Sequence, residues 1–334
     1  MQKQPVVSIV MPVRDEAAHL PVALDAIAAQ TYPSHLVEII VVDGGSTDGT
    51  LEMVRRRMRS DPRIRLLGGP GVNTPHAMEL GTGAARGDLI AKVDGHGWIN
   101  EEFLEIAVRE MQADPTLGCV GGLIRPVAST TVERAIALAR FSRLGVGGGV
   151  YTLSERTQDT DTVQCGVYRR QALAQAGGFD PALPFGEDEE LNFRVRQEGW
   201  RIRLNPAMCF SYRVRPSIRS LFRQYSRYGG ARVAVIRKHP SFFRAKHAAP
   251  AALVVGLAGG VVAAPFPGLR WLTAFVWGGY FALVATGSIV LAVRAGFRRA
   301  DLVGLSLVAL HIGYGVGSLR GIRALASRTR TKSG

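Results

Sequence analysis

The sequence predicts an α/β domain with a mostly parallel sheet and flanking helices, followed by a membrane region built from apolar helices. Two observations lead to this fold class. In the first 120 residues, short apolar runs rich in β-branched residues alternate with segments of helical spacing, which is the pattern of strand–helix–strand units. In the last third, three long apolar stretches follow a strongly basic segment. We therefore expect two structural parts with different surroundings.

The strands of the predicted sheet lie where apolar runs have the length of a buried strand. They cover residues 6–13, 37–42, 64–67, 89–93 and 117–120. Helices are expected at residues 17–30, in a segment ending near residue 59, and at 74–85, 101–113, 132–142, 169–176 and 187–198. Ligands of parallel sheets bind at the carboxyl ends of the strands. Asp43 and Asp94 lie at such ends and are therefore candidate site residues.

Charge divides the chain into two unequal parts. Residues 1–200 hold 26 acidic against 20 basic side chains, whereas residues 201–334 hold 21 basic side chains and one acidic residue, Asp301. Such a basic half predicts an anionic partner, either nucleic acid or a membrane surface. The interleaved apolar stretches at 248–267, 271–293 and 302–319 favour the membrane, because roughly 20 apolar residues span a bilayer. We expect no nucleic-acid partner.

The segment VVDGGSTDGT, residues 41–50, joins a strand-end carboxylate to a glycine turn. The glycines after Asp43 allow close approach of a ligand to the backbone. Asp43 can then accept hydrogen bonds from a base or a ribose. On its own this signal is weak, because an Asp-Gly turn is also ordinary loop sequence.

Asp94-Gly95-His96 is the second candidate motif. In an extended segment, residues two apart point the same way, so both side chains can converge on one divalent cation. A carboxylate with an imidazole suits Mn²⁺ or a similar ion better than Ca²⁺. The alternative is that Asp94 binds a ligand while His96 only packs.

Two further motifs carry charged side chains on predicted helices. Glu187 and Asp188 open a helix after a Pro/Gly loop, and one of them can take a proton from a hydroxyl. The helix dipole also favours acidic residues there, which is a purely structural reading. Gln224, Arg227 and Tyr228 lie on adjacent positions of a basic helix, where Arg227 can pair with a diphosphate.

The motifs follow one another in a fixed order. They are Pro12-Val13-Arg14-Asp15-Glu16, VDGGSTDGT, Asp94-x-His96, Gly177-Gly178-Phe179-Asp180, Glu187-Asp188 and Gln224-x-x-Arg227-Tyr228. This set resembles the family 2 inverting glycosyltransferases of the GT-A (nucleotide-diphospho-sugar transferase) fold. More narrowly, it is similar to the membrane-anchored bacterial exopolysaccharide enzymes of the succinoglycan glucosyltransferase type. The resemblance covers about residues 5–230 and extends to the hydrophobic C-terminal region.

The resemblance implies a role for each matching residue. Asp43 matches the carboxylate that reads the nucleotide base, and Asp94 matches the first Asp of the family's DxD motif, near ribose and metal. His96 replaces the last Asp of that motif, and Asp188 matches the general base. The remaining residues, assigned to binding of the nucleotide-sugar, are Pro12, Arg14, Glu16, Glu187, Gln224, Arg227 and Tyr228. The last three look like a variant of a Q-x-x-R-W element, with Tyr in place of Trp.

The function implied is transfer of a sugar from a nucleotide-diphosphate sugar to a hydroxyl of a lipid-linked saccharide, with Mn²⁺ or Mg²⁺ as cofactor. One alternative is a polyprenyl-phosphate glycosyltransferase, whose anionic acceptor needs no base. A second is a processive polysaccharide synthase, which requires a transmembrane channel. A non-enzyme alternative is a basic membrane scaffold. The oligomeric state is left open.

Four segments are expected along the chain. A cytoplasmic catalytic domain covers residues 1–212, a basic amphipathic interfacial segment covers 213–247, a membrane region of two to three spans covers 248–319, and a basic tail covers 320–334. No signal peptide precedes the first strand, so we expect the catalytic domain in the cytoplasm. The expected location is a bacterial inner membrane. Three scattered cysteines predict free thiols.

Overall fold

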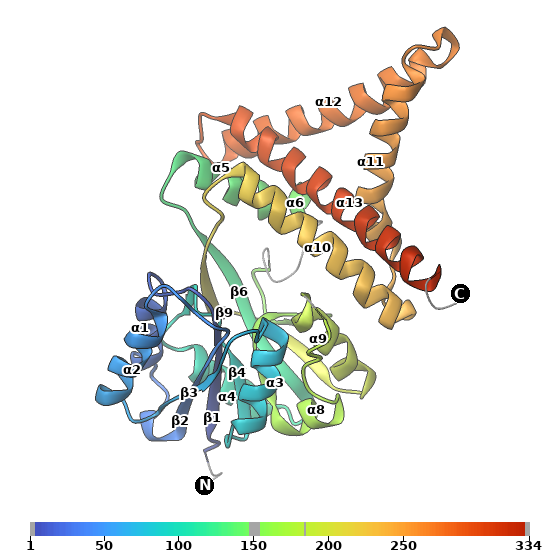
Figure 1. Cartoon of the computed structure of the whole chain (residues 1–334). Helices are drawn as coiled ribbons and strands as arrows, with labels where there is room; N and C mark the ends of the chain where they lie inside the picture. Colours follow the sequence, from blue (N-terminus) through green and yellow to red (C-terminus); the bar gives the residue numbers. More distant parts are fainter. Residues whose placement is uncertain (1–3, 147–153, 184, 331–334) are drawn as a thin grey trace. The chain divides into compact units, whose positions relative to one another are not determined.

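The computed structural model of the chain describes residues 4–146, 154–183 and 185–330. The residues group into two compact units (Figure 1). The first, the sheet unit, comprises residues 1–125 and 150–213. The second, the helical unit, comprises residues 126–149 and 214–334. Residues 126–149 thus interrupt the sheet unit in sequence but belong to the other unit.

The predicted parallel strands are present and form one half of a mixed sheet. They are β1 (Val7–Val13), β2 (Val37–Asp43), β3 (Ile64–Gly68) and β4 (Leu89–Lys92). The pairs β1–β2, β1–β4 and β2–β3 are all parallel. Nearly every side chain of β1, β2 and β4 is buried, because helices cover both faces of this part of the sheet.

The other half of the sheet is antiparallel, and most of it was not predicted. Its strands are β8 (Gln164–Arg169), β6 (Leu117–Val127), β9 (Arg201–Arg213), β5 (Gly97–Ile99) and the short β7 (Gln158–Asp159). The described residues give the strand order β3-β2-β1-β4-β8-β6-β9-β5, with β7 paired to β9. The pairs β4–β8, β6–β8, β5–β9 and β7–β9 are antiparallel.

The helices of the sheet unit lie close to their predicted positions. They are α1 (Leu20–Ala28), α2 (Thr50–Ser60), α3 (Thr74–Ala84), α4 (Phe103–Ala113), α8 (Arg170–Gln175) and α9 (Glu187–Gln197), with a 3-10 turn η1 (Ser34–Leu36). Each buries one apolar side, as Leu20, Leu24 and Ile27 do in α1. The loops that carry the candidate site residues begin at the ends of strands β1, β2 and β4.

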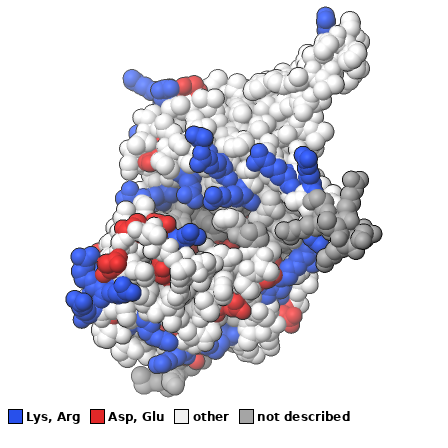
Figure 2. Space-filling view, viewed as in Figure 1, with Lys and Arg blue, Asp and Glu red and all other residues white. Residues whose placement is uncertain are grey.

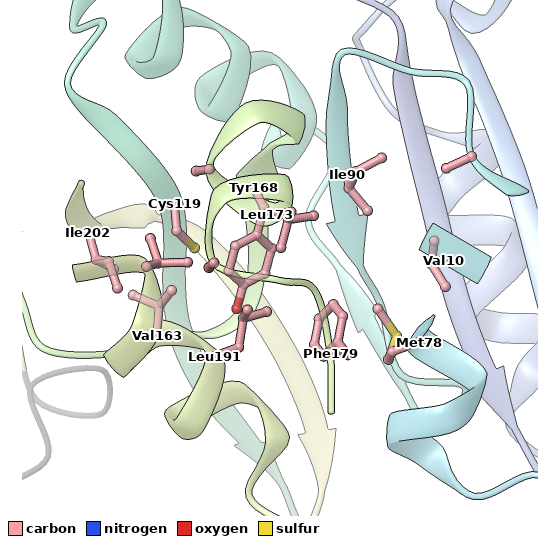
Figure 3. Close-up of a cluster of buried hydrophobic side chains, with 14 of the residues drawn as sticks. Val10, Met78, Ile90, Cys119, Val163, Tyr168, Leu173, Phe179, Leu191 and Ile202 are labelled. Carbon is pink, nitrogen blue, oxygen red and sulfur yellow. The ribbon is translucent and has the colours of Figure 1, made fainter. Parts of the chain in front are cut away.

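One buried cluster fixes the position of helix α9 on the sheet (Figure 3). Leu191 and Val195 of α9 pack into it beside the ring of Tyr168. The Tyr168 hydroxyl donates a hydrogen bond to Oδ1 of Asn192 at 3.1 Å, and Nδ2 of Asn192 donates to the carbonyl of Val163 at 3.1 Å. Since buried polar groups that are fully paired allow few alternative packings, the first turn of α9 is held in a defined place.

The helical unit contains α5 (Thr131–Arg140), α6 (Arg143–Val146), α10 (Ile218–Lys238), α11 (Ala245–Ala263), α12 (Arg270–Arg294) and α13 (Ala300–Arg330), with 3-10 turns η2 (Pro240–Phe242) and η3 (Pro267–Leu269). Helices α10 and α13 pack closely side by side, and glycines lie at their points of contact. A Cβ added to Gly317 would lie 1.9 Å from the carbonyl oxygen of Ser226, and one on Gly229 would lie 2.1 Å from that of Tyr314. Only glycine permits this approach.

Three helices among the described residues are long and apolar enough to cross a membrane by length and composition: Ala245–Ala263, Pro267–Arg294 and Ala300–Ala326. The first buries 6% of its most apolar window inside the protein, and the third buries 50%. Figure 2 shows the surface around α11 and α12 as largely uncharged, apart from a basic group at the tip between them and charged side chains near the other end of α12. The two helices therefore offer a lipid-compatible surface that α13 offers only in part.

Candidate active site

The candidate site of the sheet unit lies at the carboxyl ends of β1, β2 and β4. The loop after β1 carries Arg14 and Glu16, β2 ends at Asp43, and Asp94 follows β4. Because these strands are neighbours and parallel, their ends meet at one edge of the sheet. Pro12 is half-buried within β1, and Arg14 is exposed at the strand's end.

The carboxylate of Asp43 organises the glycine turn that follows it. Asp43 is buried and accepts hydrogen bonds from the backbone N–H of Gly45 at 2.8 Å, from the N–H of Ser46 at 3.1 Å and from the Ser46 hydroxyl at 2.5 Å. Gly45 adopts φ 88°, a left-handed backbone that favours glycine. The turn is therefore built around Asp43, whose carboxylate already has several donors before any ligand approaches.

A set of hydrogen bonds joins this turn to the loop after β1. The N–H of Thr47 donates to Oδ1 of Asp15 at 2.8 Å, and the N–H of Ala17 donates to Oδ2 of Asp48 at 3.0 Å. The hydroxyl of Thr50 accepts a hydrogen bond from the N–H of Glu16 at 2.9 Å. Both loops are thus held as one frame at the sheet edge. Asp48 serves this frame through its hydrogen bonds to Ala17 and Thr50.

The segment from Asp94 to His96 is a turn rather than the extended strand that the sequence reading assumed. Strand β4 ends at Lys92, and the N–H of Gly97 donates to the carbonyl of Asp94 at 3.3 Å. Alternation along a strand therefore cannot aim both side chains at one point. Nδ1 of His96 instead lies 3.4 Å from Oε1 of Glu16. Burial alone would lower the pKa of His96, but the Glu16 hydrogen bond and the charge of Asp94 outweigh it and raise that pKa.

These side chains fit a divalent cation that binds together with a diphosphate. Among the described residues, no group of three or more His, Cys, Asp or Glu side chains forms a complete metal site. Mg²⁺ in nucleotide sites, however, commonly uses one or two carboxylates, waters and the phosphates themselves. Asp94 keeps 24% of its side chain exposed. The Glu16 carboxylate faces Nδ1 of His96, which leaves Nε2 as the atom that a cation could use, as in many metal-bound histidines.

Lys92 is the residue of the site that sequence reasoning missed. Its ammonium, 2% exposed, lies 2.8 Å from Oε1 of Glu187, 2.7 Å from Oδ2 of Asp188 and 3.7 Å from Oδ1 of Asp94. Lys92 is the last residue of β4, so its side chain joins that strand end to the start of α9. The sequence did hold a signal, because a lysine within the apolar run 89–93 needs buried partners.

The Glu187-Asp188 pair lies in the first turn of α9, where the helix dipole favours negative charge. Oδ1 of Asp188 is buried and accepts no hydrogen bond from any residue in the described part of the chain. Burial raises the pKa of Asp188 to about 7, with Lys92 opposing the rise and the charges of Glu187 and Asp94 adding to it. A carboxylate with such a pKa is suited to accept a proton near neutral pH.

Cys165 lies next to this cluster in a strained backbone. It has φ 51°, in the left-handed region that non-glycine residues rarely adopt. Burial raises the pKa of its thiol, and the charges of Asp94 and Lys92 also act on it. Cys119, Cys165 and Cys209 are all free, as the sequence predicted, and all three are buried.

The structure brings most of the predicted site residues to one edge of the sheet unit, and the remaining three belong to the other unit. Gln224, Arg227 and Tyr228 lie on α10 of the helical unit. Gln224 is buried and its Nε2 donates to the Tyr228 hydroxyl at 3.0 Å, whereas Arg227 is exposed. Their assignment to nucleotide-sugar binding therefore stays a prediction.

Known proteins resemble this chain in both sequence and fold. Residues 8–175, half of the chain, match the family model described as glycosyl transferase family 2. The chain belongs to glycosyltransferase family 2. This family 2 glycosyltransferase is 26% identical over 318 residues to the succinoglycan biosynthesis protein ExoA of Rhizobium meliloti. The match covers 93% of each chain. The expected fold and enzyme class are therefore confirmed.

Two further similarities bear on this glycosyltransferase. It is 27% identical over 239 residues, covering 70% of this chain and 74% of the other, to a Methanococcus voltae enzyme named dolichyl N-acetyl-alpha-D-glucosaminyl phosphate 3-beta-D-2,3-diacetamido-2,3-dideoxy-beta-D-glucuronosyltransferase. Among solved structures, the mannosyltransferase PcManGT from Pyrobaculum calidifontis, in complex with GDP-Man and Mn²⁺, superposes with a TM-score of 0.63 at 20% identity. That match covers 95% of this chain and 88% of PcManGT and supports the GT-A fold.

Proposed function

We propose that the protein is a membrane-bound inverting glycosyltransferase that moves a sugar from a nucleotide-diphosphate sugar to a hydroxyl of a lipid-linked saccharide during polysaccharide assembly. The observation that carries the proposal is the state of Asp188. Its carboxylate is buried beside Asp94, its Oδ1 accepts no hydrogen bond from a described residue, and its pKa is about 7. This is a base poised for a hydroxyl proton.

The donor binds at the edge formed by the loops after β1, β2 and β4. Asp43 and the glycine turn support the nucleotide, and Arg14 is exposed at the same edge to meet the phosphates. Asp94 and His96, with Glu16 behind the imidazole, hold the divalent cation. When bound, the cation neutralises charge on the diphosphate as it leaves. PcManGT, which has this fold, was solved with GDP-Man and Mn²⁺, and that supports both ligands here.

Asp188 acts on the acceptor. Its Oδ1 takes the proton of the acceptor hydroxyl while that oxygen forms a bond to the anomeric carbon. The bond from the anomeric carbon to the diphosphate oxygen breaks, and its electron pair stays with the nucleoside diphosphate. Attack from the face opposite the leaving group inverts the anomeric configuration. A single displacement of this kind needs one base and no nucleophilic residue of the enzyme.

The acceptor we favour is a saccharide already attached to a lipid phosphate. The named acceptor of the Methanococcus voltae enzyme is a dolichyl-phosphate-linked N-acetylglucosamine, and ExoA is named for biosynthesis of a polysaccharide. A polyprenyl-phosphate acceptor is the second candidate, but its oxygen is already anionic and gives Asp188 no proton to accept. A processive synthase would need a channel through the membrane in addition to this site.

Within the helical unit, α10 and α13 bear on how the chain meets the membrane. Phe222 contacts Gly313 and Ser226 contacts Gly317, so the two helices run in parallel. The exposed side of α10 carries Arg219, Arg223, Arg227, Arg237 and Lys238. Each such charge would cost about 2.5–3.5 kcal/mol at the bilayer centre. We infer that α10 lies at the headgroup level, together with the part of α13 that packs along it.

The membrane is then entered by the hairpin of α11 and α12 alone. Helix α11 has 19 residues and is about 28 Å long, which matches a bilayer core. Arg270 lies at the turn of the hairpin, whereas Arg294 ends its second helix and Arg298 and Arg299 follow it. This arrangement keeps the C-terminus on the cytoplasmic side and agrees with the positive-inside rule, which three spans would violate.

The decisive experiment is a transfer assay on the full chain in a bacterial lipid extract. A panel of radiolabelled nucleotide-sugars is supplied with and without Mn²⁺ or Mg²⁺, and lipid-bound and free label are separated. We expect metal-dependent incorporation of one donor sugar into a lipid-linked saccharide, with release of the nucleoside diphosphate. Transfer directly to polyprenyl phosphate would support the second candidate. No incorporation or hydrolysis of any donor would contradict the proposed function.

A further inference from the structure

Lys92 is a buried cation surrounded by three carboxylates. It binds only one of the two oxygens of Asp188, and this difference bears on the proton transfer. Its ammonium donates a hydrogen bond to Oδ2 of Asp188 at 2.7 Å and another to Oε1 of Glu187 at 2.8 Å. Oδ1 of Asp188 has no such donor among the described residues. The lysine therefore distinguishes the two oxygens of a single carboxylate.

A cluster of ion pairs can also be purely structural, and the sheet unit holds a partly exposed one for comparison. Arg203 on β9 lies 3.2 Å from Glu110, 2.9 Å from Asp114 and 3.4 Å from Asp159. Like Lys92, it contacts three carboxylates, but it shares two of them, Asp114 and Asp159, with Arg201, and none of its partners belongs to the candidate site. Lys92 differs in that every carboxylate near it is a predicted site residue.

We propose that Lys92 is a positioning residue, which holds Oδ2 of Asp188 by a hydrogen bond and thereby keeps the unpaired, buried Oδ1 as the oxygen that accepts the proton of the acceptor hydroxyl. The inference rests on the proposed function of Asp188 as the base. Lys92 touches neither the donor nor the acceptor. The proton moves from the hydroxyl to Oδ1 while Oδ2 stays bound to the ammonium, so the charge on Lys92 is unchanged by the transfer.

The location of Lys92 explains why a lysine serves this purpose. Residue 92 is fixed by the ladder between β1 and β4, where it is paired with Val10. Glu187 takes a second N–H of the same ammonium, which stops the side chain from following Asp188 if the carboxylate rotates. The rigid strand and the first turn of α9 are thereby joined at the base. A misplaced reacting atom is costly, because a shift of about 1 Å can lower a rate by about 100-fold.

The test compares three variants of the full chain with the wild type. Lys92→Met removes the ammonium and keeps most of the volume. Lys92→Arg keeps the charge but places a longer, planar donor group. Arg203→Met is the control, since it removes a cation from a cluster of carboxylates outside the candidate site, where Arg201 still contacts Asp114 and Asp159. For each we would measure kcat, the donor KM, and the melting temperature in detergent.

For a positioning residue, Lys92→Met should lower kcat by at least about 100-fold while the donor KM stays within about 3-fold. Lys92→Arg should give a smaller loss of kcat, about 10-fold, with the same donor KM. Arg203→Met should lower the melting temperature but leave kcat nearly unchanged. Wild-type kcat in Lys92→Met would overturn the proposal, and so would losses of kcat and stability in Lys92→Met that match those in Arg203→Met.

A crystal structure of Lys92→Met separates this proposal from the proposed function. If the wild type transfers no sugar from any donor, the function is wrong, but the orientation of Asp188 can still be read from the two structures. Rotation of the Asp188 carboxylate away from its wild-type orientation supports the role of Lys92. An unchanged carboxylate in the variant shows that α9 alone sets the orientation, and that result overturns it.

Discussion

Replacing Asp188 by Asn gives the sharpest test of the base assignment, because the change removes basicity with little effect on packing. The amide keeps the size of the side chain, and its oxygen can still accept the hydrogen bond from Lys92. Loss of a general base typically lowers the rate by about 10² to 10⁴-fold, which corresponds to roughly 3–5 kcal/mol in the barrier. We expect kcat to fall by this factor in Asp188→Asn.

The pH dependence of the wild type follows from the same group. Burial raises the pKa of Asp188 to about 7, and a base works only in its deprotonated form. Activity should therefore rise with pH below that value and level off above it, with the deprotonated fraction growing roughly tenfold from pH 6 to pH 8. A cation bound near Asp94 favours the charged carboxylate and moves the rise toward lower pH.

The assay measures transfer of labelled sugar to lipid extract at a series of pH values, with donor binding followed separately by titration calorimetry. Asp188→Asn should lack the rise in activity with pH and should bind the nucleotide-sugar with an affinity within about threefold of the wild type. Retention of more than about a tenth of the wild-type kcat would refute the assignment. A loss of donor affinity in parallel with kcat would show that Asp188 binds substrate rather than acting as a base.

Three further predictions concern the cation, the helix packing and the membrane. His96→Ala should weaken Mn²⁺ binding by about 10-fold or more in a metal titration followed by electron paramagnetic resonance, and an unchanged titration would exclude His96 as a ligand. Gly317→Val should lower the melting temperature in detergent, because the Cβ of residue 317 would lie 1.9 Å from the carbonyl oxygen of Ser226. The matched control is Gly278→Val, because a Cβ at residue 278 meets no atom within 4 Å. A topology reporter fused after Gly334 should show that the C-terminus lies in the cytoplasm. A periplasmic signal from this reporter would favour three spans.

The strands that sequence reasoning found are those that depend on local pattern alone. β1, β2 and β4 are buried on both faces, so each is a continuous apolar run. β9 was missed because its 13 residues mix arginines with apolar residues and include Pro206, which has no N–H for the ladder. β8 is short and contains Gly166. Only pairing with distant strands makes these segments extended.

The site was predictable as a list of residue types and less so as an arrangement. Asp43 and Asp94 were found because strand ends are where a parallel sheet presents ligands. The turn at Gly95 and the contact of His96 with Glu16 are tertiary features that no spacing rule yields. The partner of Lys92 could not be read from the sequence either, since 95 residues separate it from Glu187. The sequence does show that Lys92 needs a partner, because a lysine in a buried strand must be paired.

The interruption of the sheet unit by residues 126–149 has a practical consequence for producing this enzyme without its membrane anchor. Cutting the chain near residue 213 would leave α5 attached but deprived of α13, against which it packs within the helical unit. Ala135, Ile136 and Ala139 would then be uncovered and would promote aggregation. A soluble version needs a second cut that replaces residues 126–149 with a short polar linker, so that both crossings to the helical unit are removed together.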